Sequence, residues 1–171
     1  YTMYKDQYMV GFDIVTNNLK GIIPANTRFM TVDWAVDVLK QEKASDRLNF
    51  ETIYYMYANN DVEALSKTEV ANEEKELNTG VKWISFKQKF FSYALISKDN
   101  FDDAFVELHT KSRPSNSRYQ KSMSAVIDLP FDGLNEDNKI ELSYYFGPNS
   151  FKVMKQYDLN LEDQILLMLQ N

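Results

Sequence analysis

The stretch that decides the fold is MTVDWAVDV, residues 30–38. Its even-numbered positions carry large apolar side chains, and its odd-numbered positions carry Thr, Asp or Ala. Successive side chains of a β-strand point to opposite faces of a sheet, so a period of two separates a buried face from an exposed one. Residues 30–38 are therefore predicted to form a strand that is buried on one face.

Six further stretches, rich in β-branched and aromatic residues, continue this pattern along the chain. They cover residues 8–15, 50–57, 81–97, 105–110, 123–129 and 140–146. Residues 81–97, VKWISFKQKFFSYALIS, are too long for one typical strand, so we expect two strands or one bent strand whose aromatic side chains fill the core. Residues 40–47 form a charged connector. The acidic residues 61–80 are expected to make a solvated excursion with one helical turn around Val70–Leu77.

The order of these stretches predicts an all-β fold. No helical pattern separates the strands, as the crossovers of a parallel sheet would require, so we expect an antiparallel β-sandwich over residues 1–147. The period changes to about 3.6 only after Gly147-Pro148. Residues 148–171 are predicted to form two short terminal helices, the first started by Pro148 and the second capped by Asn160.

Composition narrows the classes of function. A length of 171 residues fits one compact domain, and a formal charge of −6 opposes binding to nucleic acid. The absence of cysteine removes disulfides and thiolate chemistry. The N-terminus shows no signal peptide, and the apolar run 165–169 is far shorter than the roughly 20 residues of a membrane-spanning helix. We therefore expect a soluble piece of a longer protein.

The aromatic run Trp83–Phe91 resembles the periplasmic domain of bacterial YidC insertases, particularly those of the Bacteroidetes type. Three other pieces follow in that family's order. They are the strand ending at Leu39 with Gln41-Glu42-Lys43 after it, the Tyr54-Tyr55 strand followed by Asn60-Asp61, and Tyr145-Phe146-Gly147-Pro148-Asn149 leading to Lys155-Gln156-Tyr157-Asp158. Each motif is weak alone, but the ordered set covers nearly the whole chain.

The resemblance implies a galactose-mutarotase-like β super-sandwich, or its C-terminal half, because the chain is expected to begin partway through the family's domain. Such a domain lies on the periplasmic face of the bacterial inner membrane, with terminal helices that lead toward a membrane span absent from this chain. It implies an accessory part of an insertase that helps insert and fold integral membrane proteins. The implied partners are nascent membrane proteins and Sec translocon components such as a SecF-like subunit, contacted by a monomer.

Motifs for bond-making chemistry are missing from the sequence. His109 is the only histidine, and we interpret it as a partly exposed strand residue. The adjacent carboxylates Asp102-Asp103 and Glu136-Asp137 are typical of turns. We expect no enzyme, no cofactor and no metal site. The alternatives are an exported carbohydrate-binding or sugar-active β-sandwich, which would expose aromatic rings beside carboxylates, and a structural spacer.

Two sets of residues are candidates for contact with a partner or a membrane. The terminal apolar stripe would either dock on the sandwich or lie at the bilayer interface. The basic loop Lys111–Lys121 would either attract anionic headgroups or be an ordinary solvated loop. The stripe consists of Phe151, Met154, Leu161, Ile165, Met168 and Leu169, and the basic loop carries Lys111, Arg113, Arg118 and Lys121.

Overall fold

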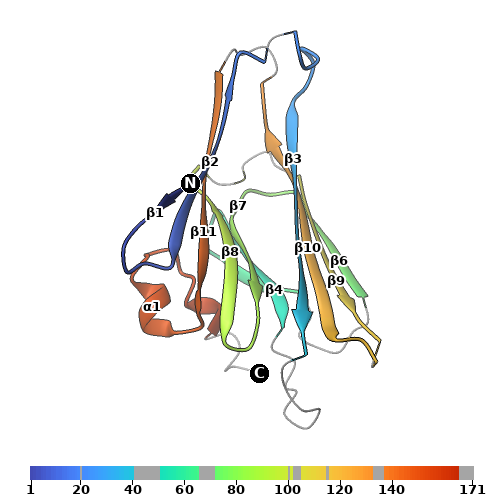
Figure 1. The fold of residues 1–171 in the computed structure, drawn as a ribbon, viewed down its shortest axis with the longest axis vertical. Coiled ribbons are helices and arrows are strands. Elements are labelled where there is room, and N and C mark those ends of the chain that lie inside the picture. The colour runs from blue at the N-terminus through green and yellow to red at the C-terminus, as the bar shows by residue number, and fades with distance from the viewer. Residues whose placement is uncertain are drawn as a thin grey trace.

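The fold is a two-layered β-sandwich (Figure 1) in a computed structural model that describes residues 1–19, 21–40, 51–65, 72–99, 101, 105–114, 116–132 and 137–165. A seven-stranded sheet has the order β1-β2-β11-β8-β7-β4-β5, and a four-stranded sheet has the order β3-β10-β9-β6. The strands are β1 (Thr2–Met3), β2 (Met9–Asn17), β3 (Phe29–Leu39), β4 (Thr52–Tyr57), β5 (Val62–Ala64), β6 (Asn72–Leu77), β7 (Val81–Lys87), β8 (Phe91–Ser97), β9 (Phe105–Ser112), β10 (Tyr119–Pro130) and β11 (Asp137–Pro148).

Every strand pairing between the described residues is antiparallel, which confirms the predicted fold class. The long aromatic stretch 81–97 forms two strands, β7 and β8, which pair as a hairpin. Their inward-facing side chains, such as Ile84, Phe86 and Leu95, are fully buried in the core between the sheets. The period of two in the sequence thus predicts both the strands and the buried face.

The prediction of a helical turn around Val70–Leu77 is wrong. Residues Asn72–Leu77 form strand β6, which pairs with β9 from Asn72 opposite Lys111 to Leu77 opposite Val106. Only Leu77 of this strand is fully buried, and the glutamates Glu74 and Glu76 are exposed. Pairing along a neighbouring strand outweighs the weak helix preference of Glu and Lys, because propensity is a small term beside tertiary contacts.

The start of the terminal helix also differs from the prediction. Pro148 is the last residue of β11, opposite Phe91 of β8, and helix α1 (Phe151–Lys155) begins three residues later. Asn160 lies in a turn with a left-handed φ of 52°, and residues 163–165 are helical again. Pro148 therefore ends strand β11 instead of opening a helix. The charged connector 40–47 falls outside the described residues from position 41 onward.

One long side of the sandwich is closed by a polar clamp between the sheets. The hydroxyl of Tyr55 on β4 donates to Glu63 Oε2 on β5 at 2.7 Å. Lys75, on β6 of the other sheet, hydrogen-bonds the Tyr55 hydroxyl and pairs with Glu63 at 3.0 Å. The hydrogen bond from Tyr55, followed by that from Lys75, lowers the pKa of Glu63.

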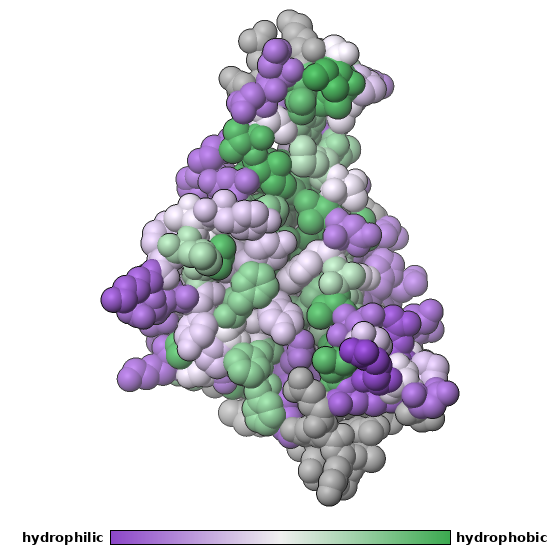
Figure 2. Space-filling model, viewed as in Figure 1, coloured by the Kyte–Doolittle hydropathy of each residue, from purple (hydrophilic) through white to green (hydrophobic). Residues whose placement is uncertain are grey.

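The opposite side of the sandwich, between β2-β11 and β3, is open. The inward-facing residues of β10, such as Met123 and Ile127, are fully buried, whereas Val32, Trp34 and Val36 of β3 are only half-buried. Figure 2 shows a band of hydrophobic and pale residues running down the middle of this face, with hydrophilic residues on both sides. The four-stranded sheet is too narrow to cover the seven-stranded one.

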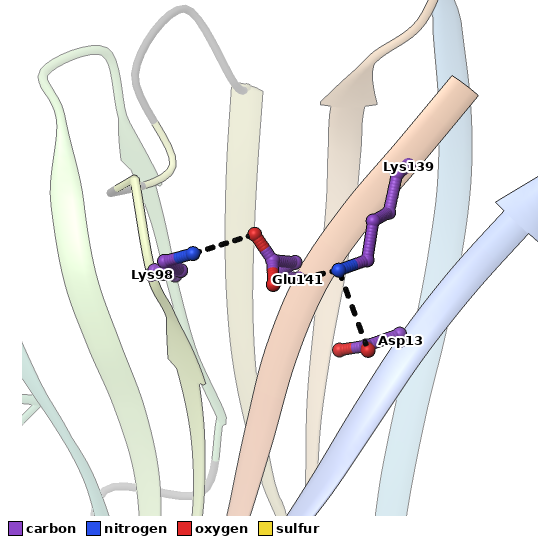
Figure 3. A network of polar contacts seen from close by, with 4 residues as sticks. All are labelled: Asp13, Lys98, Lys139 and Glu141. Atoms are coloured by element: carbon purple, nitrogen blue, oxygen red, sulfur yellow. Dashed lines mark hydrogen bonds and ion pairs between the residues drawn. The ribbon is translucent and has the colours of Figure 1, made fainter. Parts of the chain in front are cut away.

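A charged network links β2 and β11 with Lys98, the residue that follows β8 (Figure 3). Glu141 lies between Lys98 at 2.7 Å and Lys139 at 2.8 Å, and Lys139 also approaches Asp13 at 3.9 Å. Hydrogen bonds from Lys139 and then Lys98 lower the pKa of the Glu141 carboxyl to about 2. The network is open to solvent, so its attraction is screened by salt.

Candidate functional site

The outer face of the seven-stranded sheet carries the C-terminal segment, residues 149–165 (Figure 1). Met154 of α1 and Leu161 are fully buried against the sheet. Around them pack the partly buried Val153, Tyr157 and Ile165. The apolar floor beneath comes from four neighbouring strands and consists of Tyr54, Met56, Trp83, Ala94, Ile96 and Tyr145.

A buried polar group lies beside this apolar contact. Gln164 is fully buried, and its side-chain oxygen accepts hydrogen bonds from Ser85 Oγ at 2.9 Å and from Ser92 Oγ at 3.3 Å. Its amide nitrogen lies 3.7 Å from Met154 Sδ. Buried amides and hydroxyls are costly to leave without partners, so these bonds specify one position for the segment on the sheet.

The motif Tyr145–Asn149 forms the corner at which the chain leaves the sheet. Gly147 leaves room for the ring of Tyr145, since a Cβ at this position would lie 2.6 Å from that ring. The Tyr145 hydroxyl donates to the carbonyl of Pro148 at 2.7 Å. Asn149 then binds the β7–β8 hairpin through two hydrogen bonds. Its side-chain nitrogen donates to the Gln88 carbonyl at 2.6 Å, and its side-chain oxygen accepts from Ser92 Oγ at 2.6 Å.

Two further hydrogen bonds fasten the segment along its length. The indole N–H of Trp83, beneath the segment, donates to the carbonyl of Leu159 at 2.8 Å. The hydroxyl of Tyr157 accepts from the backbone N–H of Tyr8 at 2.9 Å, which joins the segment to the start of the chain. The segment is therefore held at its beginning, middle and end.

The predicted apolar stripe is divided by this arrangement. Met154 and Leu161 are buried on the sheet, and Ile165 is half-buried there. Phe151 points outward and is 42% exposed. Met168 and Leu169 lie outside the described residues. The stripe was expected either to dock on the sandwich or to lie at the bilayer interface. The side chains of Met154 and Leu161 dock on the sandwich, because they face the sheet.

The predicted basic loop is shorter than expected, because Lys111 lies in β9 and Lys121 in β10. Lys121 is buried, which lowers its pKa, and its ammonium group donates to the carbonyl of Glu51 at 2.8 Å. Arg113 pairs with Asp37 at 2.8 Å. Among the described residues, Lys111 and Arg118 are exposed and have no carboxylate partner. Two of the four predicted basic side chains, Arg113 and Lys121, therefore bind groups of the domain itself.

His109 lies on the outer face of the four-stranded sheet, between Glu74 Oε1 at 3.6 Å and Glu107 Oε2 at 3.5 Å. The hollow around it is lined by these residues with Lys75 and Glu76, and none of the five is a Trp, Tyr or Phe on which a sugar could stack. Asp102, Asp103 and Glu136 lie outside the described residues. Within the described ranges, no group of three or more His, Asp or Glu side chains could hold a metal ion.

The sequence reasoning missed the polar part of the docking site. Ser85 and Ser92 interrupt the aromatic run 81–97 on the face opposite the core, and Lys87 between them is also buried. In the sequence, small polar residues on the outer face of an otherwise apolar hairpin indicate that another segment covers this face. Their partner Gln164 could not be identified, because the contact spans more than 70 residues of sequence.

A second site missed from the sequence is an exposed aromatic tip at the β7–β8 turn. Phe90 and Phe91 are 59% and 54% exposed, and the Phe90 carbonyl accepts the backbone N–H of Asn149 at 2.8 Å. Lys89 lies over the Phe90 ring at 5.1 Å, and Lys155 lies over the Phe151 ring at 5.2 Å. The turn and the start of the C-terminal segment thus each carry an exposed aromatic ring beside an ammonium group.

Comparison with known proteins finds one family along almost the entire chain. The YidC periplasmic domain matches residues 1–165. A membrane protein insertase YidC from Parabacteroides distasonis is 34% identical over 161 residues, which cover 92% of this chain and 24% of that protein. Insertases of the same name from Porphyromonas gingivalis and Bacteroides fragilis are 26% and 28% identical and cover 95% and 96% of this chain. The chain spans about a quarter of the length of these relatives.

Among the described residues, no helix has the length and apolarity needed to cross a membrane.

Proposed function

The chain belongs to the YidC periplasmic domain family, and on that premise we propose that it is a non-enzymatic accessory domain of a membrane protein insertase. It acts on the periplasmic face of the bacterial inner membrane, as a single copy, while the membrane-embedded part of the longer protein inserts and helps fold integral membrane proteins. Its partners are segments of nascent membrane proteins and components of the Sec translocon, a SecF-like subunit included.

The observation that carries this proposal is the docked C-terminal segment. A tether that leads from the sandwich to a membrane span transmits position only if it is fixed on the sandwich. Residues 149–165 are fixed by the burial of Met154 and Leu161, by the Gln164 hydrogen bonds and by the Trp83–Leu159 bond. A spacer without partners needs no such attachment.

The aromatic tip supports a membrane-facing orientation. Exposed Phe rings next to Lys side chains suit the bilayer interface, where the ring enters the apolar boundary and the ammonium group stays with the headgroups. Phe90 and Phe151 meet this description near the corner where the C-terminal segment begins, and Phe91, next to Phe90 in the chain, is also exposed. In this proposal they contact lipid, and Met154 and Leu161 do not.

The test is complementation in cells depleted of their own insertase, with the full-length protein carrying Leu161→Asp and Gln164→Leu together. A carboxylate at position 161 enters the apolar contact, and Leu at position 164 removes the acceptor of Ser85. We expect a severalfold loss of insertion of a reporter membrane protein at unchanged protein level. Lys152→Gln, on the exposed side of α1, is the matched control and retains insertion.

A deletion of residues 1–148 that keeps residues 149–171 separates the accessory domain from a mere spacer. Loss of insertion or of co-purifying Sec components supports the proposal. Insertion at the full rate with both the deletion and the double variant contradicts it.

A further inference from the structure

The β9–β10 loop carries two exposed cations that form no ion pair among the described residues. They are Lys111, at the end of β9, and Arg118, directly before β10. The guanidinium carbon of Arg118 lies 5.0 Å from the centroid of the Tyr119 ring. The ammonium group of Lys89 lies over the Phe90 ring in the same way, at 5.1 Å. The loop therefore repeats the pairing of a cation with an aromatic ring that marks the aromatic tip.

The loop and the aromatic tip lie at the same end of the sandwich (Figure 1). The start of β4 connects them, because the ammonium group of Lys121 donates to the Glu51 carbonyl at 2.8 Å and the next residue, Thr52, pairs with Lys87 at the end of β7. On the far side of the β7–β8 turn, Asn149 joins the turn to the C-terminal segment. We call this surface the basic end, and it consists of residues 88–90, 111–118 and 149–155.

The charge of the basic end has one sign. Its sequence contains six basic residues and no acidic residue. Arg113 and Lys155 are paired with carboxylates of the domain, whereas Lys111, Arg118 and Lys152 are exposed to solvent. Near an anionic bilayer each cation strengthens binding by about fivefold. The exposed cations of the basic end thus suit a surface of negatively charged headgroups.

The opposite end of the strands is rich in acidic residues. The chain as a whole has a formal charge of −6, so an anionic surface repels most of the molecule. Of the cations at that end, Lys98 is held by Glu141, and Arg28 donates to two backbone carbonyls. An anionic bilayer therefore favours the orientation in which the basic end faces it. The acids in the connections at the opposite end are Asp61, Asp99, Asp102, Asp103, Asp132 and Glu136.

We propose that the basic end binds anionic phospholipid headgroups, so that the domain stands on the bilayer with this end toward the membrane. The inference rests on the membrane-facing orientation proposed above, and it adds the β9–β10 loop as a second contact and anionic lipid as the partner. Lys111, Arg118 and Lys152 meet headgroup phosphates, while the rings of Phe90 and Phe151 enter the apolar boundary. Two contacts on different parts of the sandwich fix its tilt.

Fluorescence quenching by lipids with a spin-labelled headgroup tests the orientation. The chain contains no Cys, so one introduced Cys carries the fluorophore in a cysteine-free form of the longer protein, reconstituted in vesicles of phosphatidylglycerol and phosphatidylcholine. Asn116→Cys labels the β9–β10 loop, and Asn78→Cys labels the β6–β7 turn at the opposite end as the matched control; both residues are exposed. We expect quenching several times stronger at position 116. Equal quenching at the two positions overturns the proposal.

Removal of charge in the same assay tests the class of lipid. We expect Lys111→Gln with Arg118→Gln to lower the quenching at position 116 at least threefold, as roughly fivefold per cation allows. Vesicles of pure phosphatidylcholine should lower it as much. Arg28→Gln with Lys82→Gln removes the same charge from the opposite end and should leave the quenching unchanged.

Two results of this assay overturn the proposal. One is quenching at position 116 that does not depend on phosphatidylglycerol, and the other is an equal loss in the two double variants. Insertion of the reporter protein is measured separately. Weak quenching at full insertion contradicts this inference alone, and strong quenching with full insertion by the Leu161→Asp and Gln164→Leu variant contradicts the proposed function alone.

Discussion

Gly147 has no room for a side chain at the corner where the chain leaves the sheet. A methyl group there would lie 2.6 Å from the Tyr145 ring and 2.9 Å from Tyr8 Cβ. Neither neighbour moves cheaply, because the Tyr145 hydroxyl is bonded to Pro148 and the backbone of Tyr8 is bonded to Tyr157 and Phe146. The same corner carries part of the motif by which the sequence resembles its family, so a steric need explains this piece of the resemblance.

We predict that Gly147→Ala lowers the free energy of unfolding by about 1–3 kcal/mol, the usual cost of overpacking. Gly11→Ala is the control, since its added methyl would lie 3.4 Å from Thr2 Cβ, an ordinary contact beside a two-residue strand. Urea unfolding of both variants measures the difference. Equal effects of the two substitutions would show that the corner has more room than the structure indicates.

Glu141 gives the domain a defined acid sensitivity. Its pKa is lowered to about 2 by hydrogen bonds from Lys139 and Lys98, so the carboxylate stabilises the folded state at any pH above its ordinary value of 4.5. That contribution is lost as the pH falls from 4.5 toward 2. In Glu141→Gln we expect the urea midpoint to fall less steeply over this range, and the difference from the native chain to shrink in high salt. An unchanged slope at low salt would contradict the network.

Neighbouring inward-facing positions of β3 differ in how well the sandwich covers them. Val38 is 3% exposed, whereas Val36, two residues earlier on the same face, is only half-buried. We predict that Val38→Ala costs about 2 kcal/mol and Val36→Ala roughly half as much in the chain of residues 1–171. Thermal or urea unfolding checks the ratio. A larger cost at position 36 would mean that this side of the sandwich is closed.

The exposed aromatic tip at the β7–β8 turn and the start of α1 is expected to bind lipid membranes. Replacing Phe90, Phe91 and Phe151 by Ser should reduce binding of the chain to lipid vesicles severalfold, because three exposed rings lose their burial in the interface. The control replaces Ile22 and Phe29, which are also exposed but belong to the β2–β3 end of the molecule (Figure 1). Co-sedimentation with the vesicles measures both. Equal losses would indicate general stickiness and no oriented tip.

Elements with strong period-two patterns could be predicted from the sequence, and elements decided by distant partners could not. Residues 30–38 and 81–97 alternate so clearly that their strands and buried faces follow from the side chains alone. Strand β6 carries an acidic sequence without an apolar face and exists because β9 lies beside it. The docking of Gln164 depends likewise on Ser85 and Ser92, far away in the sequence.

The sandwich as a whole is asymmetric in two respects. One side is closed by the Tyr55–Glu63–Lys75 clamp, and the other is open along β3. One outer face is covered by the C-terminal segment, and the outer face of the four-stranded sheet carries charged side chains such as Glu74 and Glu107.

On this structure, residues 149–165 are part of the sandwich, and we expect them to keep their docked position without a bilayer. Hydrogen exchange of this segment measures it directly, in the longer protein reconstituted in lipid and in the chain of residues 1–171 without lipid. We expect slow exchange in both samples for the amides of Met154, Tyr157 and Ile165, which are hydrogen-bonded within the docked segment. Fast exchange without lipid, or protection that appears only when the bilayer is present, would contradict it.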